Sequence, residues 1–286
     1  MQNDRLFATF RGLPGNPPLP LLVHGLFDQQ MASWPALNRA YAALQSARRR
    51  EILQDGVPFI IQFNPGRIVS VEANVEKAAL ANRPCFLCPD HLPPEQQAIL
   101  YRDAFMILCN PHPIFTTHLT VAHCLHEPQS LEGSIVPFLE LAREFSPDFS
   151  LFYNGPRCGA SAPDHLHFQG YPTGALPVES VAVKQEGHLV MESGGVAVWS
   201  LNLPGRALLL LAGEDQGPLA KILGETLAVM RVLSGGQEEA MVNVVASFQQ
   251  RQWRIFIFSR QKHRPSAFFR EAESRRAITP GAAEMG

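Results

Sequence analysis

Residues 152–169, FYNGPRCGASAPDHLHFQ, contain two histidines and a glutamine at alternate positions. Side chains two residues apart lie on the same face of a β-strand, so His165, His167 and Gln169 are expected to project together. A strand rises roughly 3.3 Å per residue, which separates the two imidazoles by about 6–7 Å. That separation is too long for a direct hydrogen bond, but it suits two adjacent chemical tasks. The alternative is a polar strand face without any reaction centre.

The loop before these histidines favours a reaction centre. Its small residues would let backbone amides approach an anion closely, and Arg157 offers a guanidinium group to the same anion. A neutral imidazole can act as a nucleophile without a separate base. The amide of Gln169 can donate to a phosphate oxygen on which charge develops. These residue types together indicate chemistry on a phosphorylated substrate.

A second motif, RPCFLCPD, places Cys85 and Cys88 in a Cys-x-x-Cys spacing. A tight turn of this length aims both thiolates at one point, which makes half of a tetrahedral zinc site. The sequence contains no second pair of this kind, so histidines would have to complete the ligand set. A redox role is the alternative, although the thioredoxin-like βαβ context is missing. The candidate ligands are His91, His112, His118, His123, His126 and His165.

The composition narrows the class of protein. Of the 286 residues, 46% are apolar and 17% are charged, which is typical of a compact globular protein. The net charge is −2, so we expect no basic field that would attract nucleic acid or an anionic membrane. The start of the chain lacks the pattern of a secretory signal, and no apolar stretch approaches the roughly 18 residues of a membrane span. These features predict a cytoplasmic protein.

The order of the hydrophobic patterns predicts an α+β fold with two tandem related lobes of antiparallel strands and packed helices. Residues 1–57 are predicted to form an N-terminal helical extension, which includes a helix with a basic end at Arg48 to Arg50. Residues 58–175 form the first lobe, with both motifs. Residues 176–286 repeat the order of strands, helix and strands without a second His-x-His pair. The ending ITPGAAEMG is typical of a truncated or disordered tail.

Two further segments carry basic side chains next to predicted strands. QFNPGR (62–67) offers Asn64 and Arg67 at a turn, and SRQKHRP (259–265) offers Arg260 and Lys262 at a strand end. Such groups bind polyphosphates and sugar phosphates. A solvated basic turn is the alternative for both segments.

Taken together, these motifs resemble the histidine triad superfamily, specifically its nucleotidyltransferase branch with the signature His-x-His-x-Gln. NGPRCGASAPDHLHFQ is similar to the corresponding segment of diadenosine tetraphosphate phosphorylases, and CFLC is similar to the metal motif of galactose-1-phosphate uridylyltransferases. HLTVAHCLH (118–126) has the spacing of the histidine triad strand. QFNPGR and SRQKHRP resemble segments of GDP-hexose phosphorylases. The resemblance extends from about residue 58 to residue 265.

This resemblance implies a role for each residue of the first motif. His167 would attack the α-phosphorus of a nucleotide donor and hold the nucleotidyl group as a phosphoramidate. Gln169 would orient the phosphoryl group, and Ser161 with its loop amides would bind its oxygens. Asn154 and Arg157 would contribute to the same substrate-binding set. Phe168 replaces the glycine of the uridylyltransferases, so their sugar-nucleotide specificity does not transfer.

The resemblance also implies a structural zinc ion. Cys85, Cys88, His126 and His165 would fill all four positions, with His123 as the alternative to His126. The loop between Ser161 and His165 is one residue longer than in the phosphorylase pattern, and Asp164 occupies the extra position.

The activity that the resemblance implies is transfer of a nucleoside monophosphate from a dinucleoside polyphosphate or an NDP-sugar to phosphate or a sugar phosphate. One alternative is a nucleotide hydrolase of the same fold, with water as the acceptor. Another is a non-catalytic, zinc-stabilised nucleotide-binding protein. The expected partner is a nucleotide or sugar-nucleotide substrate, without nucleic acid or membrane, and the expected state is a monomer or homodimer.

Overall fold

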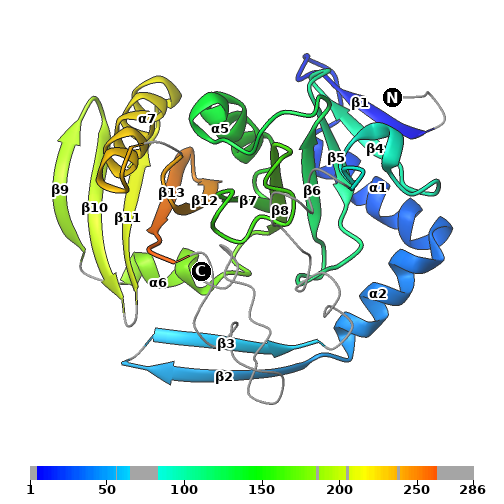
Figure 1. The fold of residues 1–286 in the computed structure, drawn as a ribbon, viewed down its shortest axis with the longest axis horizontal. Coiled ribbons are helices and arrows are strands. Elements are labelled where there is room, and N and C mark those ends of the chain that lie inside the picture. Colours follow the sequence, from blue (N-terminus) through cyan, green and yellow to red (C-terminus); the bar gives the residue numbers. More distant parts are fainter. Residues whose placement is uncertain are drawn as a thin grey trace. The chain divides into compact units, whose positions relative to one another are not determined.

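A computed structural model describes residues 5–55, 57–64, 83–184, 187–203, 206–236 and 239–262. It confirms the predicted α+β class (Figure 1). The contacts between residues divide the chain into two compact units. The first unit takes its described residues from Met1–Arg48, Gln62–Gln129 and Ser161–Pro172. The second unit takes them from Arg49–Ile61, Ser130–Ala160 and Thr173–Gly286. The two tandem lobes over residues 58–175 and 176–286 stay a prediction.

The first unit contains strands in the order β1-β4-β5-β6-β8. β1 is parallel to β4, and the other three neighbouring pairs are antiparallel. β5 is buried along its whole length and β6 along most of it, so these two strands form the centre of the core. The bounds of the strands are Leu6–Phe10 (β1), Ala98–Tyr101 (β4), Phe105–Cys109 (β5), Leu119–His123 (β6) and His167–Pro172 (β8).

Two helices accompany this sheet, α1 (Leu19–Ser33) and α2 (Pro35–Gln45). Trp34 separates them, because Pro35 has no backbone N–H to continue α1 but fits the first position of a new helix. Leu37, Tyr41 and Leu44 of α2 are buried, as their spacing predicts.

The predicted basic helix end at Arg48 to Arg50 is wrong. These residues begin strand β2 (Arg48–Gln54), which pairs with β3 (Val57–Phe63) in a separate two-stranded sheet. The apolar periodicity of α2 stops at Leu44, so a longer helix would have no further face to bury.

The second unit contains strands in the order β7-β12-β13-β11-β10-β9, and all of the neighbouring pairs within it are antiparallel. β12 and β13 form a hairpin that turns at Gln250 and Arg251. Among the described residues, no helix is long and apolar enough to cross a membrane. The strands are Phe149–Asn154 (β7), His188–Ser193 (β9), Val196–Leu203 (β10), Arg206–Gly213 (β11), Val242–Gln249 (β12) and Gln252–Ser259 (β13), and the helices are Ile135–Glu144 (α5), Pro177–Lys184 (α6) and Gln216–Leu233 (α7).

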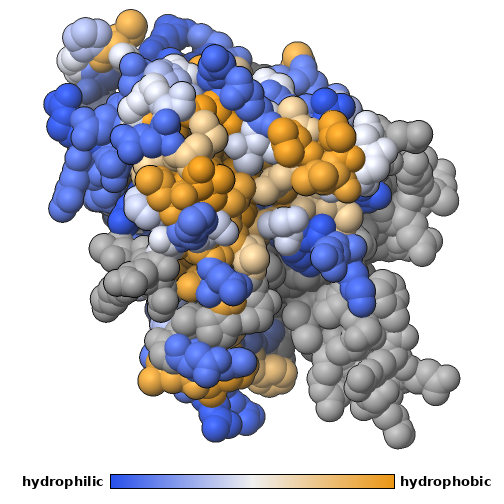
Figure 2. Space-filling model, turned by 90° about the vertical axis from the view of Figure 1, so that its left-hand side faces the viewer, coloured by the Kyte–Doolittle hydropathy of each residue, from blue (hydrophilic) through white to orange (hydrophobic). Residues whose placement is uncertain are grey.

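Helix α5 contacts β7, β12 and β13, and α7 contacts β10 and β11. Figure 2 views the side of the molecule on which β9 and α7 lie, and it shows apolar side chains gathered on that surface. The exposed large apolar residues of these two elements are Leu189, Val190 and Met191 of β9 and Val229, Val232 and Leu233 of α7. All the side chains of β9 are exposed, and its register with β10 shifts between Met191 and Leu189. Such an irregularity is one way in which an edge strand resists further pairing.

Candidate functional site

The Cys-x-x-Cys motif forms a tight turn directly before a short 3-10 helix, Pro89–His91. The backbone N–H of Cys88 donates to the carbonyl of Cys85 over 3.2 Å, and the N–H of His91 donates to the carbonyl of Cys88 over 2.9 Å. The ring of His91 also donates from Nδ1 to the Cys85 carbonyl, at 3.0 Å. His91 therefore stabilises the turn, while the two thiols point away from it to a common point.

Cys85, Cys88, His126 and His165 come together around that point, in the first unit. One ligand atom from each of them lies within 4.8 Å of all the others. The Sγ of Cys85 is 3.3 Å from His165 Nδ1, and the Sγ of Cys88 is 3.3 Å from His126 Nδ1. Two thiols and two imidazoles are a donor set that suits tetrahedral coordination. The cluster could therefore hold a metal ion.

The outer nitrogens of both rings face acceptors, as they do in metal-bound histidines. His165 donates from Nε2 to the backbone carbonyl of His123 over 2.8 Å, which leaves the lone pair on Nδ1. The Nε2 of His126 is 3.7 Å from a carboxylate oxygen of Asp164. Asp164, the extra residue relative to the phosphorylase pattern, therefore places a carboxylate at the outer side of His126. This arrangement supports the cluster residues as ligands.

The protonation states of Cys88 and His165 are compatible with a metal site. Burial and the adjacent Cys85 raise the pKa of Cys88 to about 11, so its thiolate needs a positive partner at neutral pH. Burial lowers the pKa of His165, which keeps that ring neutral. His123 is not part of the cluster: its Nδ1 contacts the backbone of Leu125, at 3.3 Å.

His167, the first residue of β8, is buried and its ring is held in one tautomer. Its Nδ1 donates to the backbone carbonyl of His165 over 2.8 Å, so Nε2 carries the lone pair. Burial lowers the pKa of His167 to about 4, because the charged imidazolium would lose its hydration. A buried neutral imidazole with a lone pair at Nε2 is suited to nucleophilic attack.

A residue that the sequence analysis missed, Gln129, fixes the backbone of His167. Its Oε1 accepts from the backbone N–H of His167 at 2.7 Å, and its Nε2 donates to the carbonyl of the same residue at 3.0 Å. This side chain therefore contacts both backbone groups of His167, as a neighbouring strand would. Gln129 is only 3% exposed, so water does not readily replace either bond. Its place in the sequence carries no motif or periodicity that would reveal this role.

Gln169 lies two residues further along β8, opposite Thr120 of β6. Its Oε1 is 2.9 Å from Nε2 of His118, the residue directly before β6. His118 was among the predicted metal candidates, but its ring is directed to Gln169 on the neighbouring strand and is not part of the cysteine–histidine cluster.

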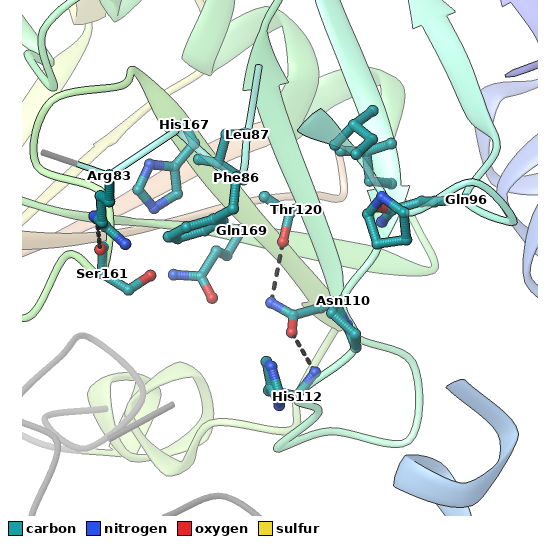
Figure 3. A pocket seen from close by; sticks show the side chains of 14 residues that line it. Arg83, Phe86, Leu87, Gln96, Asn110, His112, Thr120, Ser161, His167 and Gln169 are labelled. Atoms are coloured by element: carbon teal, nitrogen blue, oxygen red, sulfur yellow. Dashed lines mark hydrogen bonds between the residues drawn. The ribbon is translucent and has the colours of Figure 1, made fainter. Parts of the chain in front are cut away.

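A cavity of about 390 Å³ opens in front of His167 and Gln169, and Figure 3 shows both side chains directed into it. This volume lies within the range of small-molecule sites. Arg83, which was also not predicted, lines the cavity and donates to the backbone carbonyl of Ser161 over 3.1 Å. The Arg83 guanidinium lies 5.0 Å from the centre of the Phe86 ring. The remaining lining residues are Leu87, Leu92, Pro93, Gln96, Leu108, Asn110, Pro111, His112 and Thr120.

The other predicted substrate-binding residues of the described chain do not line this cavity. In the second unit, the amide of Asn243 donates to Asn154 over 2.8 Å, and its Oδ1 accepts from Arg260 at 2.8 Å. Arg157 and Lys262 are exposed in that unit, and Asn64 directly follows β3. Arg67 lies outside the described residues. Substrate binding by these residues stays a prediction.

Residues 26–172 match a family described as Domain of unknown function (DUF4922). The match covers just over half of the 286-residue chain. The chain belongs to the DUF4922 family. The DUF4922 match includes both cysteines and both histidines of the cluster, as well as His167, Gln169 and Gln129. No curated protein sequence matches the chain.

This DUF4922 chain is also similar to solved structures. Yeast Ap4A phosphorylase Apa2 is 14% identical with a TM-score of 0.47, over 78% of this chain and 80% of that chain. The same yeast enzyme in complex with Ap4A has a TM-score of 0.46 at 14% identity, over 79% and 80% of the two chains. A DUF4931 family protein (BCE0241) from Bacillus cereus ATCC 10987 has a TM-score of 0.41 at 14% identity, over 60% and 90%. Likenesses of this strength establish no shared reaction.

Replacing a cluster ligand is expected to remove the metal. We expect the wild-type protein to contain about one metal ion per chain, and Cys88→Ser and His126→Ala to lose most of it. His123→Ala is the matched control, because its ring lies outside the cluster while its backbone carbonyl stays in place. Elemental analysis of the purified proteins measures the content. Equal loss in His123→Ala, or no metal in the wild type, would contradict the assignment.

Replacing Gln129 by leucine is expected to destabilise the protein by about 2–4 kcal/mol, because two buried backbone groups of His167 lose their partners. Chemical denaturation measures the change in the free energy of unfolding. Gln249→Leu is the control: it removes a single exposed hydrogen bond to Pro147 and should cost less than about 1 kcal/mol. If the two variants lose similar free energies of unfolding, the two hydrogen bonds of Gln129 to the backbone of His167 contribute no more than a surface hydrogen bond.

Proposed function

We propose that this protein is a nucleotidyltransferase that acts through a covalent nucleotidyl-His167 intermediate. The donor is a dinucleoside polyphosphate or an NDP-sugar, and the acceptor is phosphate or a sugar phosphate. The observation that carries the proposal is the hydrogen bond from Nδ1 of His167 to the His165 carbonyl, which leaves the lone pair on Nε2 of a ring that lines the cavity. A fixed nitrogen lone pair is the requirement for attack on phosphorus.

The first half-reaction forms a nitrogen–phosphorus bond. Nε2 of His167 attacks the α-phosphorus, and the bond to the bridging oxygen of the leaving group breaks with its electron pair. The resulting phosphoramidate ring carries positive charge, which the His165 carbonyl stabilises through its bond from Nδ1. In the second half-reaction an acceptor oxygen attacks phosphorus, the nitrogen–phosphorus bond breaks, and Nε2 recovers its lone pair.

Three residues of the cavity are suited to the phosphoryl oxygens. The amide of Gln169 lies on the same face of β8 as His167 and can donate to a non-bridging oxygen. The guanidinium of Arg83 lines the same cavity and can pair with a phosphoryl oxygen, and it also lies 4.0 Å from a carboxylate oxygen of Asp164. Ser161, whose backbone carbonyl holds Arg83, also lines it. We assign substrate binding to these three residues.

The metal at the cluster is proposed to be zinc in a structural role. Two cysteines and two histidines would fill its four positions, so no site would remain for a substrate or water. Zinc would supply a cross-link between the cysteine turn and His165. The carbonyl of His165 accepts the hydrogen bond from Nδ1 of His167. The cross-link would therefore fix the carbonyl that orients the ring of His167.

The intermediate is expected to be detectable on the protein. Incubation with α-³²P-labelled ATP, GDP-hexose or UDP-hexose should label the wild type, and the label should be acid-labile, as a phosphoramidate is. His167→Ala should remove the label completely, whereas His123→Ala should retain it. Label that persists in His167→Ala, or a wild type that none of the donors labels, would overturn the proposal.

The acceptor is expected to be phosphate or a sugar phosphate. With the donor that labels the protein, release of nucleotide product should rise at least about tenfold when phosphate or a hexose phosphate is added, because the better nucleophile captures the intermediate. Product analysis by anion-exchange chromatography measures this. Release of nucleoside monophosphate that is independent of any added acceptor would indicate the nucleotide hydrolase instead. Ligand-induced stabilisation without turnover would indicate the non-catalytic nucleotide-binding protein.

A further inference from the structure

We propose that Tyr41 and His118 are positioning residues that fix the side-chain amide of Gln169 with its NH₂ group directed to the substrate. The inference rests on the proposed function for its chemical meaning, but its geometry is independent of it. The two residues belong to the first unit, as does the cavity, and both are buried, with 4% of Tyr41 and 1% of His118 exposed. Neither of them lines the cavity. They therefore act through Gln169.

The tautomer of His118 follows from the backbone. The N–H of Ile114 points to Nδ1 of His118 at 3.4 Å, and a backbone N–H is always a donor. Nδ1 must therefore be the acceptor nitrogen of the ring, and the proton lies on Nε2. Nε2 is 2.9 Å from the side chain of Gln169, so the atom of Gln169 that faces it must be the oxygen.

This orientation decides what Gln169 presents to the cavity. Its oxygen accepts from His118, which leaves the NH₂ group as the end available to a ligand. A phosphoryl oxygen is an acceptor only, so it attracts the NH₂ group and would be repelled by the amide oxygen. Without His118 the amide could rotate and present either end. The bond from His118 thus prepares a donor before the substrate arrives.

Tyr41 holds His118 in the position that this bond requires. The hydroxyl of Tyr41, on helix α2, accepts from the backbone N–H of His118 at 3.0 Å and donates to its carbonyl at 3.2 Å. Burial raises the pKa of Tyr41, so the hydroxyl keeps its proton and can serve both bonds. Its ring packs edge-on against Phe27 of α1, at 5.0 Å between centroids. Helices α1 and α2 are in this way connected to the donor in the cavity.

A double-mutant cycle on the rate of protein labelling tests this inference. Gln169→Ala is expected to slow labelling by about 10²–10³-fold, the cost of a lost oxyanion donor. His118→Ala is expected to slow it by about 10–100-fold, through loss of orientation. The double variant should be no slower than Gln169→Ala alone, within about twofold, because His118 has nothing left to orient. His118→Gln, which retains a donor at a similar reach, should recover most of the rate.

Two further variants separate positioning from general damage to the fold. Tyr41→Phe keeps the ring contact with Phe27, and it should lower the rate constant of labelling with little change in the donor concentration at half-saturation. His118→Ala combined with Ser161→Ala is the control cycle. Ser161 lines the same cavity, and its backbone carbonyl accepts from Arg83, so these two effects should multiply. If the rate losses of His118→Ala and Gln169→Ala multiply in the double variant, the inference is overturned.

A spectroscopic measurement tests the geometry even if no donor labels the wild type. In a ¹⁵N–¹H spectrum of the histidine side chains, the Nε2 proton of His118 should be visible as a hydrogen-bonded signal, assigned by its loss in His118→Gln. Gln169→Ala should shift or broaden it, and Ser161→Ala should leave it unchanged. Absence of labelling would count against the proposed function alone. An unshifted signal in Gln169→Ala would count against the role of His118 alone.

Discussion

The hydrogen bond from His167 Nδ1 to the backbone carbonyl of His165 is the interaction on which the candidate site depends. It determines which nitrogen of His167 keeps its lone pair, and it joins the two motifs of the sequence physically. The side chain of His165 belongs to the cysteine–histidine cluster, while its backbone carbonyl contacts the proposed nucleophile. One residue therefore connects a proposed structural metal to a proposed nucleophile. This connection explains why a metal without an open position would still matter for catalysis.

The remaining contacts around the cavity restrict the same strand from several sides. Gln129 fixes the backbone of His167, and β6 pairs with β8 along the other edge. His118 fixes the side chain of Gln169. Each contact removes a degree of freedom from a group that would otherwise have to be ordered when the substrate binds. Such preorganisation is the main contribution that a protein makes to the stabilisation of developing charge.

Much of this site could be predicted from the sequence, because its chemistry is local. The cysteine spacing and the alternation of His165, His167 and Gln169 carry their meaning within a few residues. The choice of His126 over His123 rested on a resemblance, and one ring nitrogen of His126 lies in the cluster. Strand β8 itself begins only at His167, so His165 leaves the regular alternation and turns to the cysteines.

Other features could not be predicted because they depend on tertiary contacts. Gln129 lies 38 residues before His167, and its role follows only from the fold. The sequence alone leaves His118 as a metal candidate. The register of β6 and β8 instead places its ring beside Gln169. Arg48 to Arg50 continued a helical pattern in composition but offered no apolar face, so they form a strand.

The tautomer of His167 tests the central claim most directly. In a ¹⁵N–¹H long-range correlation spectrum of the metal-loaded protein near pH 7, one histidine, identified by its absence from His167→Ala, should carry its proton on Nδ1 and none on Nε2. The same signal should change when Cys88→Ser removes the metal, since the His165 carbonyl would lose its anchor. A proton on Nε2 of His167, or a tautomer that is indifferent to the cluster, would contradict this account.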